Sequence, residues 1–228
     1  MIDAAMHWFG FGLCHQLAAR SFFGGGHQLP VCARDTGIYV GFVVSMLVLA
    51  VTERGGRRTG MPPAGILALG LAALAIMGWD GVTSYAGLRE TTNVIRLATG
   101  VGTGFALTLV IVPILNAQLW VRSSPASILS SPGAVVAWCA AAPVTFAAVY
   151  WVGPLTGAAY PLLVAAAVIA TFTAVNLVVV LLVPRFERRF DRLREAWPAI
   201  ALALVATAVE LAAADWFRLW LLSFASRR

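Results

Sequence analysis

Lysine is absent from this chain of 228 residues, and charged residues of every kind make up only 11% of it. All sixteen basic residues are therefore arginine, and most of them lie in short loops between long apolar runs. Hydrophobic residues make up 60% of the chain and its mean hydropathy is +0.85, values outside those of a soluble globular domain. The formal net charge of +6 does not indicate nucleic-acid binding, because arginines in such loops orient helices in a bilayer. The composition predicts an integral membrane protein.

Other features that the sequence lacks exclude further classes of protein. No segment of about ten residues alternates apolar and polar positions, as the strands of a transmembrane barrel do. No serine lies in the GxSxG setting of a serine hydrolase. His7, His15 and His27 all lie in one N-terminal segment, whereas a haem-binding bundle needs histidines on facing helices. The first twenty residues also lack the basic start, clean apolar run and small-residue cleavage site of a signal peptide.

Six apolar runs are long enough to cross the roughly 30 Å hydrocarbon core of a bilayer as helices. They cover residues 36–52, 62–79, 98–118, 134–152, 158–183 and 197–215. Residues 4–22 are interrupted by polar side chains and could form a seventh span, a re-entrant piece or an interfacial helix. The sequence predicts an all-α, polytopic transmembrane bundle. We expect one integral membrane domain over residues 1–228, with a motif segment at 1–35 and the helical bundle at 36–221.

Arginines cluster in three of the loops that join these runs. The clusters are Arg54, Arg57 and Arg58; Arg122; and Arg185, Arg188, Arg189, Arg192 and Arg194. If every run spans once, the three loops share one side, which the positive-inside rule makes cytoplasmic. The N-terminal segment and the loop 80–97 then face outward from the plasma (inner) membrane. We expect the aromatic tail from Asp215 onward to lie along the outer interface.

Two polar stretches, residues 14–39 and 79–100, should therefore meet on the outward face. In the second stretch Arg89, Asn93 and Arg96 have helical spacing, and they share one face if the third strong span begins early. Asp80 precedes them at the end of the second strong span. Because ionisable groups are costly at membrane depth, each of these side chains is a candidate functional residue.

The first polar stretch contains side chains that bind metals. Cys14, Cys32 and Asp35, joined by His15 or His27, would provide the mixed sulfur, oxygen and nitrogen ligands that suit zinc. The three-residue step from Cys32 to Asp35 places both side chains on one face at the start of a helix. Two alternatives stay open, a Cys14–Cys32 disulfide in an oxidising compartment and free thiols packed as small hydrophobes.

The arginines of the two stretches have two interpretations. Arg34, Arg89 and Arg96 could form an anion clamp, because guanidinium groups bind phosphate bidentately and stay charged at membrane depth. Asn93 could then orient the anion, and Asp80 could act as a general base or as a counter-ion. In the second interpretation the arginines extend to the interface and pair with nearby carboxylates. The clamp predicts a lipid headgroup as the ligand.

The order of these residues resembles that of a known family. The chain has CHQ at residues 14–16, Arg20 followed by Ser21, and QLPVCARDTGIY at residues 28–39. This is similar to the pattern of a bacterial polytopic membrane family, number 2085 among the domains of unknown function, in which CHQ and RSF precede CxRCTGIYxGF. Asp35 departs from that pattern, because the family has the second cysteine of a CxxC pair there. The resemblance implies a membrane fold and no established activity.

Three functions are consistent with the sequence. The first is a membrane enzyme, a metal-dependent hydrolase or transferase whose outward-facing, zinc-binding site acts on an anionic or lipid-linked substrate. The second is a transporter or lipid translocator that binds the same anionic headgroup without breaking a bond. The third is a non-catalytic membrane scaffold. We favour the enzyme, with membrane lipids as partners, because polar groups of acid, base and ligand type concentrate on one face.

Overall fold

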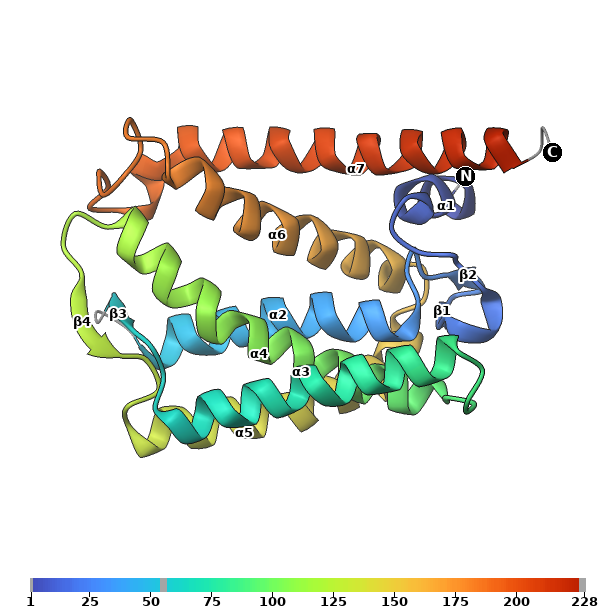
Figure 1. The fold of residues 1–228 in the computed structure, drawn as a ribbon, viewed down its shortest axis with the longest axis horizontal. Helices are drawn as coiled ribbons and strands as arrows, with labels where there is room; N and C mark the ends of the chain where they lie inside the picture. The colour runs from blue at the N-terminus through green and yellow to red at the C-terminus, as the bar shows by residue number, and fades with distance from the viewer. Residues whose placement is uncertain (1, 54–56, 226–228) are drawn as a thin grey trace.

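The structure is a computed structural model that describes residues 2–53 and 57–225. Its described part contains seven α-helices, drawn in Figure 1. They are α1 (Ile2–Phe11), α2 (Ala33–Thr52), α3 (Ala64–Tyr85), α4 (Asn93–Leu119), α5 (Pro132–Ala147), α6 (Ala159–Leu181) and α7 (Trp197–Ala225). Short helical turns lie at η1 (Ala18–Arg20), η2 (Ala148–Val152), η3 (Gly153–Thr156) and η4 (Leu193–Ala196). The chain is an all-α bundle, as predicted.

Six helical segments are long and apolar enough to cross a membrane, which confirms the six predicted spans; α5 reaches that length together with η2 and η3. The last of them differs from the prediction at its end. α7 continues to Ala225 instead of ending at residue 215, and Figure 1 shows no change of direction there. Residues 215–225 contain neither glycine nor proline and continue the helix, so the aromatic tail is part of α7, and its position at the outer interface stays a prediction.

The most extensive helix packing in the bundle is between α2 and α4, and glycines allow it. A Cβ atom on Gly100 of α4 would lie 2.1 Å from the carbonyl oxygen of Arg34, and one on Gly37 of α2 would lie 2.6 Å from that of Leu97. Such distances leave no room for any side chain. The two backbones approach closely, as they do where small residues line helix interfaces in membranes. This contact fixes the start of α2 against the start of α4.

The interior of the bundle is mainly apolar but contains one buried hydrogen-bond network. Ser45 of α2 and Thr108 of α4 lie 2.6 Å apart between their hydroxyl oxygens, and the indole of Trp138 on α5 donates to Ser45 over 2.8 Å. Phe105 stacks against the same indole at a tilted angle. Because buried polar groups need partners, this network fixes the register of α2, α4 and α5.

The arginine-rich loops gather at one end of the bundle, which we call the arginine-loop end (residues 57–60, 120–131 and 184–196). Here β3 (Arg58–Gly60) pairs in parallel with β4 (Ser124–Ser127), and Trp120 forms an isolated bridge with Phe190. The prediction that these loops share one side is therefore confirmed for the described arginines. Arg54 lies outside the described residues.

The opposite end, which we call the cysteine end, is formed by residues 2–35, the end of α3 and the start of α4. A hairpin of β1 (Phe23–Gly24) and β2 (His27–Gln28) turns through Gly25 and Gly26, whose φ angles of 58° and 83° suit glycine. Figure 1 shows α1, this hairpin and the end of α7 together at this end. The two predicted polar stretches thus meet in space.

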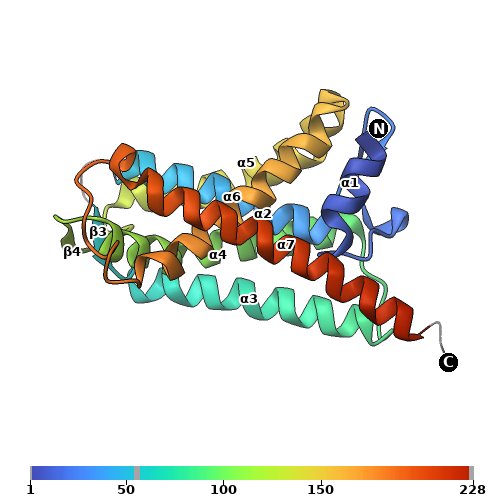
Figure 2. The same ribbon diagram turned by 90° about the horizontal axis from the view of Figure 1, so that it is seen from above.

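Helix α1 caps the cysteine end and does not cross a membrane. Its ten residues are about 15 Å long, half of what a hydrocarbon core requires. This length excludes the seventh span among the three alternatives for residues 4–22. Asp215 of α7 accepts a hydrogen bond from the Gly12 amide over 2.6 Å, and Arg218 donates to the Cys14 carbonyl oxygen over 2.6 Å. Figure 2 shows α1 lying across the end of the bundle beside α7.

Candidate functional site

Two cysteines and one aspartate meet at the start of α2. Cys32 is the N-cap residue of the helix, Asp35 lies in its first turn, and Cys14 comes from the loop after α1. The Cys32 thiol donates to Oδ2 of Asp35 over 3.3 Å, as the three-residue step predicted. The two sulfur atoms and a carboxylate oxygen lie within 4.8 Å of one another. We call these three residues the cysteine–aspartate cluster.

Two glutamines hold the loop that carries Cys14. The Gln16 side chain donates to the carbonyl oxygens of Pro30 (2.9 Å) and Met6 (3.2 Å), while Gln28 donates to the carbonyl oxygen of Gln16 (2.8 Å). These bonds fasten the loop to α1 and to the segment before α2. The sequence interpretation gave neither glutamine a role, although both belong to the quoted motif. Gln16 lies two residues after Cys14, and Gln28 lies four residues before Cys32. This closeness to the two cysteines is the signal that could have suggested the role of the glutamines.

The thiols of the cluster differ in acidity. A hydrogen bond from the Cys32 side chain lowers the pKa of Cys14 to about 7, and partial burial opposes this shift. The same hydrogen bond and burial raise the pKa of Cys32 above its ordinary value. Both cysteines are free thiols in the structure, so the disulfide alternative is not formed there. Cys14 is therefore the more acidic of the two thiols.

The two candidate histidines lie outside this cluster. His27 is in β2, and its Nδ1 lies 2.8 Å from Oδ1 of Asp3, with which it pairs. His15 follows Cys14 and lines the neighbouring cleft. Within residues 2–53 and 57–225, the group of ligand atoms that could hold one ion contains neither histidine.

The cluster has a donor set that suits zinc, and its ligand atoms lie close enough together to reach one ion. Zinc binds thiolate sulfur at about 2.3 Å and carboxylate oxygen at about 2.1 Å, so two ligands of one ion lie about 3.5 to 3.8 Å apart. The 3.3 Å between Sγ of Cys32 and Oδ2 of Asp35 is close to this value. The ligand atoms of the cluster lie at most 4.8 Å apart, so side-chain movements of about 1 Å would bring all three to coordination distance. The positive end of the α2 dipole also favours anionic ligands at this position. The residues present therefore fit a zinc ion with three protein ligands.

Asp80 is enclosed by cations next to the cluster. Its side chain is 1% exposed, and its Oδ2 accepts from Arg34 over 2.5 Å. Its other oxygen pairs with Arg89 and accepts from the Thr91 hydroxyl over 2.9 Å. Of the two roles considered for Asp80, this geometry matches the counter-ion, because both oxygens are engaged. Arg34 and Arg89 share this one carboxylate, so the three side chains together keep a net charge of +1.

Arg89 reaches Asp80 from a loop and not from a helix. The side chain of Thr92 caps α4 by accepting from the amide of Ile95 over 3.3 Å, so the helix begins at Asn93. The prediction that Arg89 continues the helical face of Asn93 and Arg96 is therefore wrong. The N-cap threonine ends the helical register before Arg89.

Two further arginines border the cluster without a carboxylate partner in the described part of the chain. Arg96 is 8% exposed and donates to Oδ1 of Asn93 over 3.1 Å, and Asn93 in turn donates to the Ala19 carbonyl oxygen over 3.2 Å. The Arg20 guanidinium lies over the ring of Tyr85, 5.5 Å from its centroid. Arg20 was not among the predicted site residues, although it follows CHQ in the motif.

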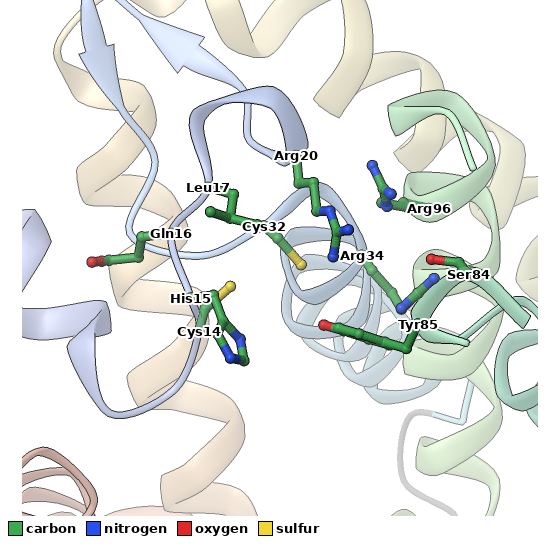
Figure 3. Close-up of a pocket in the computed structure, with 10 residues that line it drawn as sticks. All are labelled: Cys14, His15, Gln16, Leu17, Arg20, Cys32, Arg34, Ser84, Tyr85 and Arg96. Atoms are coloured by element: carbon green, nitrogen blue, oxygen red, sulfur yellow. The ribbon is translucent and has the colours of Figure 1, made fainter. Parts of the chain in front are cut away.

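Cys14, Cys32, Arg20, Arg34 and Arg96 line one narrow cleft, which we call the arginine cleft. Figure 3 shows the sulfur atoms of Cys14 and Cys32 facing this space, with Arg20 and Arg34 beside them. Arg96 lies further along the same wall. The enclosed space of about 20 Å³ is enough for one water molecule. A larger polar cavity of about 410 Å³ adjoins it and shares the His15–Gln16 wall.

One buried donor of the cleft has no acceptor. The Nε atom of Arg34 is buried and lacks a hydrogen-bond partner among the residues that the structure describes. A buried guanidinium N–H without an acceptor costs free energy unless an anion or water bonds to it. The cleft thus combines two cations without carboxylates and the two thiols of the cluster, beside an arginine whose buried Nε lacks an acceptor.

Comparisons with known proteins give a family but no activity. A family model described as predicted membrane protein (DUF2085) matches residues 14–110. An uncharacterized protein of Methanocaldococcus jannaschii is 38% identical over 108 residues, which are 47% of this chain and 67% of that protein. An uncharacterized protein of Methanothermobacter thermautotrophicus is 35% identical over 98 residues, 42% of this chain and 82% of that protein. No solved structure matches the chain.

The matched segment contains every residue of the cysteine–aspartate cluster and of the arginine cleft. Helices α5, α6 and α7 lie beyond it. Both relatives are archaeal, so the similarity extends beyond the bacteria that the sequence motif suggested.

Proposed function

The chain belongs to the DUF2085 family of predicted membrane proteins. We propose that it is a membrane enzyme with a zinc centre that acts on an anionic group. The observation that carries this proposal is that the cluster and the arginine cleft share one wall. Cys14 and Cys32 line the same space as Arg34, whose Nε lacks an acceptor. A metal and an anion would therefore bind side by side, and the cleft, which now has space for one water molecule, would widen to admit the anion.

Each residue has a distinct part in this proposal. Cys14, Cys32 and Asp35 hold the zinc, which supplies Lewis-acid chemistry when bound and retains a coordination position that the protein does not fill. Arg20 and Arg96 bind the anion through charge-assisted hydrogen bonds. Asn93, Asp80, Arg89 and Thr91 are positioning residues: Asn93 orients Arg96, Asp80 holds Arg34, and Arg89 and Thr91 hold Asp80.

The substrate in this proposal carries a phosphate or a similar anion, either on a lipid headgroup or on a soluble molecule. Guanidinium groups match the geometry of phosphate and keep their charge near a membrane. The adjoining cavity of about 410 Å³ is polar and could accommodate the remainder of the headgroup. Because the arginine-loop end is expected on the cytoplasmic side, the cleft in this proposal faces the extracytoplasmic side of the plasma membrane.

Metal content tests the first half of the proposal. Protein purified in detergent without added metal should contain about one zinc per chain by elemental analysis, and Cys32→Ser and Asp35→Asn should each lose it. His27→Ala is the matched control, because His27 pairs with Asp3 away from the cluster and should leave the zinc in place. A free-thiol count that finds Cys14 and Cys32 oxidised to a disulfide, with no metal present, would refute the zinc centre.

Anion binding and turnover test the second half. We expect the wild type to bind either inorganic phosphate in detergent or phosphatidic acid in nanodiscs, and the two probes distinguish a soluble substrate from a lipid. Arg96→Gln should weaken this binding about tenfold, since a charge-assisted hydrogen bond contributes about 1.5 kcal/mol or more. Arg122→Gln, an exposed change at the arginine-loop end, should have no effect. Zinc-dependent release of phosphate from the bound probe would support an enzyme.

A lipid translocator that uses the same cleft is the second candidate. It is favoured by a polar contact inside the spans, where Asn176 of α6 donates to Glu210 of α7 over 2.9 Å and to Thr207 over 3.1 Å. Polar groups at this depth commonly mark a pathway or a partner. Headgroup binding without any bond cleavage, together with lipid movement that Glu210→Gln abolishes, would favour this candidate over the enzyme.

A further inference from the structure

A second, larger cavity lies near the arginine-loop end, away from the cysteine–aspartate cluster. It has a volume of about 520 Å³ and lies between the second halves of α2, α4 and α6. Most of its wall is aliphatic, with Leu49, Leu115 and Leu177 each buried. Three membrane-spanning helices thus enclose a space with the chemistry of a hydrocarbon chain.

The cavity is polar at only one end, where the spans meet the loops. Trp120 lies there, and the Arg57 guanidinium is stacked 4.2 Å from the centroid of its ring. Arg57 also donates to the backbone carbonyl oxygen of Asp191. Since a guanidinium group has five N–H donors, most of those on Arg57 remain available. No carboxylate in the described part of the chain forms an ion pair with it.

The one carboxylate on the cavity wall is already compensated. Glu53 pairs with Nε of Arg58 over 3.1 Å and accepts from the Leu129 amide over 2.9 Å, and its side chain is only 8% exposed. Arg57 therefore gives the polar end of the cavity an uncompensated positive charge. An anionic group is the complement of that charge.

The loop 184–196 closes the cavity on the side away from the membrane interior. The Arg188 amide donates to the Gln118 carbonyl oxygen over 2.6 Å, and the Phe190 amide donates to that of Leu119 over 3.2 Å. Leu193, three residues after Phe190 in the same loop, is part of the cavity wall. A ligand that lies along the spans would thus meet a fixed wall at its polar end.

We propose that this cavity binds an anionic phospholipid of the surrounding bilayer, with one acyl chain between α2, α4 and α6 and the phosphate on Arg57. The combination of an aliphatic wall, one interfacial tryptophan and one unpaired arginine matches the two parts of such a lipid. This site is independent of the zinc centre and of the arginine cleft, because it uses none of their residues.

Native mass spectrometry of the full-length protein with added lipid tests this proposal. Phosphatidylglycerol should bind with a stoichiometry of one and more tightly than phosphatidylcholine of the same chain length. Arg57→Gln should weaken phosphatidylglycerol binding about tenfold and remove the preference over phosphatidylcholine. Ala174→Leu, which adds three carbon atoms to the cavity wall, should abolish binding of both lipids.

Matched variants separate this site from general effects. Arg122→Gln removes an exposed charge at the same end, and Ala140→Leu enlarges an exposed side chain on α5, so both should bind lipid as the wild type does. Cys32→Ser should also leave lipid binding unchanged, which makes a failure here distinguishable from a failure of the zinc proposal. Equal binding of the two lipids by the wild type, or wild-type binding by both Arg57→Gln and Ala174→Leu, would overturn the proposal.

Discussion

At the cysteine end, Arg34 and Arg89 both reach Asp80, a carboxylate whose side chain is 1% exposed. At the arginine-loop end, Arg58 pairs with Glu53 while its own side chain is 29% exposed. Both ends thus hold a buried carboxylate, since the side chain of Glu53 is only 8% exposed, but only the cysteine end also buries an arginine, because the side chain of Arg34 is 10% exposed. The cost of leaving a charge unpaired is much greater in the interior than in contact with solvent.

This difference separates two uses of arginine in one chain. The three arginine-rich loops lie together at one end, where they satisfy the pattern that orients membrane helices. The arginines at the other end are partly buried among polar partners from three segments, and two of them lack a carboxylate in the described part of the chain. We infer that burial, and not the number of arginines, distinguishes the arginines of the candidate site from those that orient the helices in the membrane.

The largest effect should follow from Asp80→Asn. The amide keeps the shape of the carboxylate but leaves Arg34 and Arg89 without a negative charge, which for a buried pair costs about 3–5 kcal/mol. We expect a large fall in the thermal unfolding temperature of the detergent-purified protein. Glu90→Gln is the control, because Glu90 is exposed in the same loop and should change stability by less than about 0.5 kcal/mol. A wild-type melting temperature for Asp80→Asn would show that the buried pair does not hold the two arginines.

The next largest effect should come from the close contact between α2 and α4. In Gly100→Ala the new methyl group would lie 2.1 Å from the carbonyl oxygen of Arg34, so the helices must separate at a cost of about 1–3 kcal/mol. Gly78→Ala is the matched control, because a Cβ atom there meets nothing within 4 Å. We expect Gly100→Ala to lower the melting temperature and Gly78→Ala to leave it unchanged or raise it slightly. Equal melting temperatures for the two variants would contradict the packing argument.

The sequence was sufficient to predict the spans and the meeting of the two polar stretches. Both follow from local properties, since apolar runs of about twenty residues must be helices in a bilayer and alternate spans return to the same side. The step from Cys32 to Asp35 was equally local, because three residues are nearly one helical turn. These predictions needed no knowledge of how the helices pack.

The pairing of the arginines could not be predicted in this way. Arg34 and Asp80 are separated by 46 positions, and only the α2–α3 geometry decides that they meet. Arg218, which holds the Cys14 loop, comes from the last helix and has no local signal. The sequence pattern grouped Arg89 with Arg96, but Thr92 caps the helix between them and gives the two arginines different partners.

A third, smaller effect concerns the reactivity of Cys14 at the cysteine end. In metal-free Cys139→Ser protein, alkylation of Cys14 by iodoacetamide should rise with pH and reach half its maximum near pH 7, because the thiolate is the nucleophile. At pH 7 about half of Cys14 is ionised, against about one hundredth of a thiol with the ordinary pKa of 9.0. Allowing for the weaker nucleophilicity of a more acidic thiol, we expect about a fivefold faster reaction than for an ordinary thiol.

Peptide mass spectrometry resolves this reaction by site. Cys32 should react slowly throughout the neutral range because its pKa is raised. Denaturation in dodecyl sulfate serves as the control, since both cysteines should then react at similar rates. A midpoint for Cys14 at pH 8.5 or above in the folded protein would contradict the predicted hydrogen bond from Cys32.

The smallest effect should follow from Glu53→Gln, the counterpart of Asp80→Asn at the arginine-loop end. The amide oxygen can still accept from the Leu129 amide, and Arg58 keeps its hydrogen bonds to the Ser127 carbonyl oxygen and the Ser130 hydroxyl. Because Arg58 remains in contact with solvent, the lost ion pair should cost no more than about 1 kcal/mol. The two amide variants, melted side by side in one detergent, test the comparison directly. If Glu53→Gln lowered the melting temperature as much as Asp80→Asn, burial would not distinguish the two ends. The arginines of the cysteine end would then have no role different from that of the loop arginines.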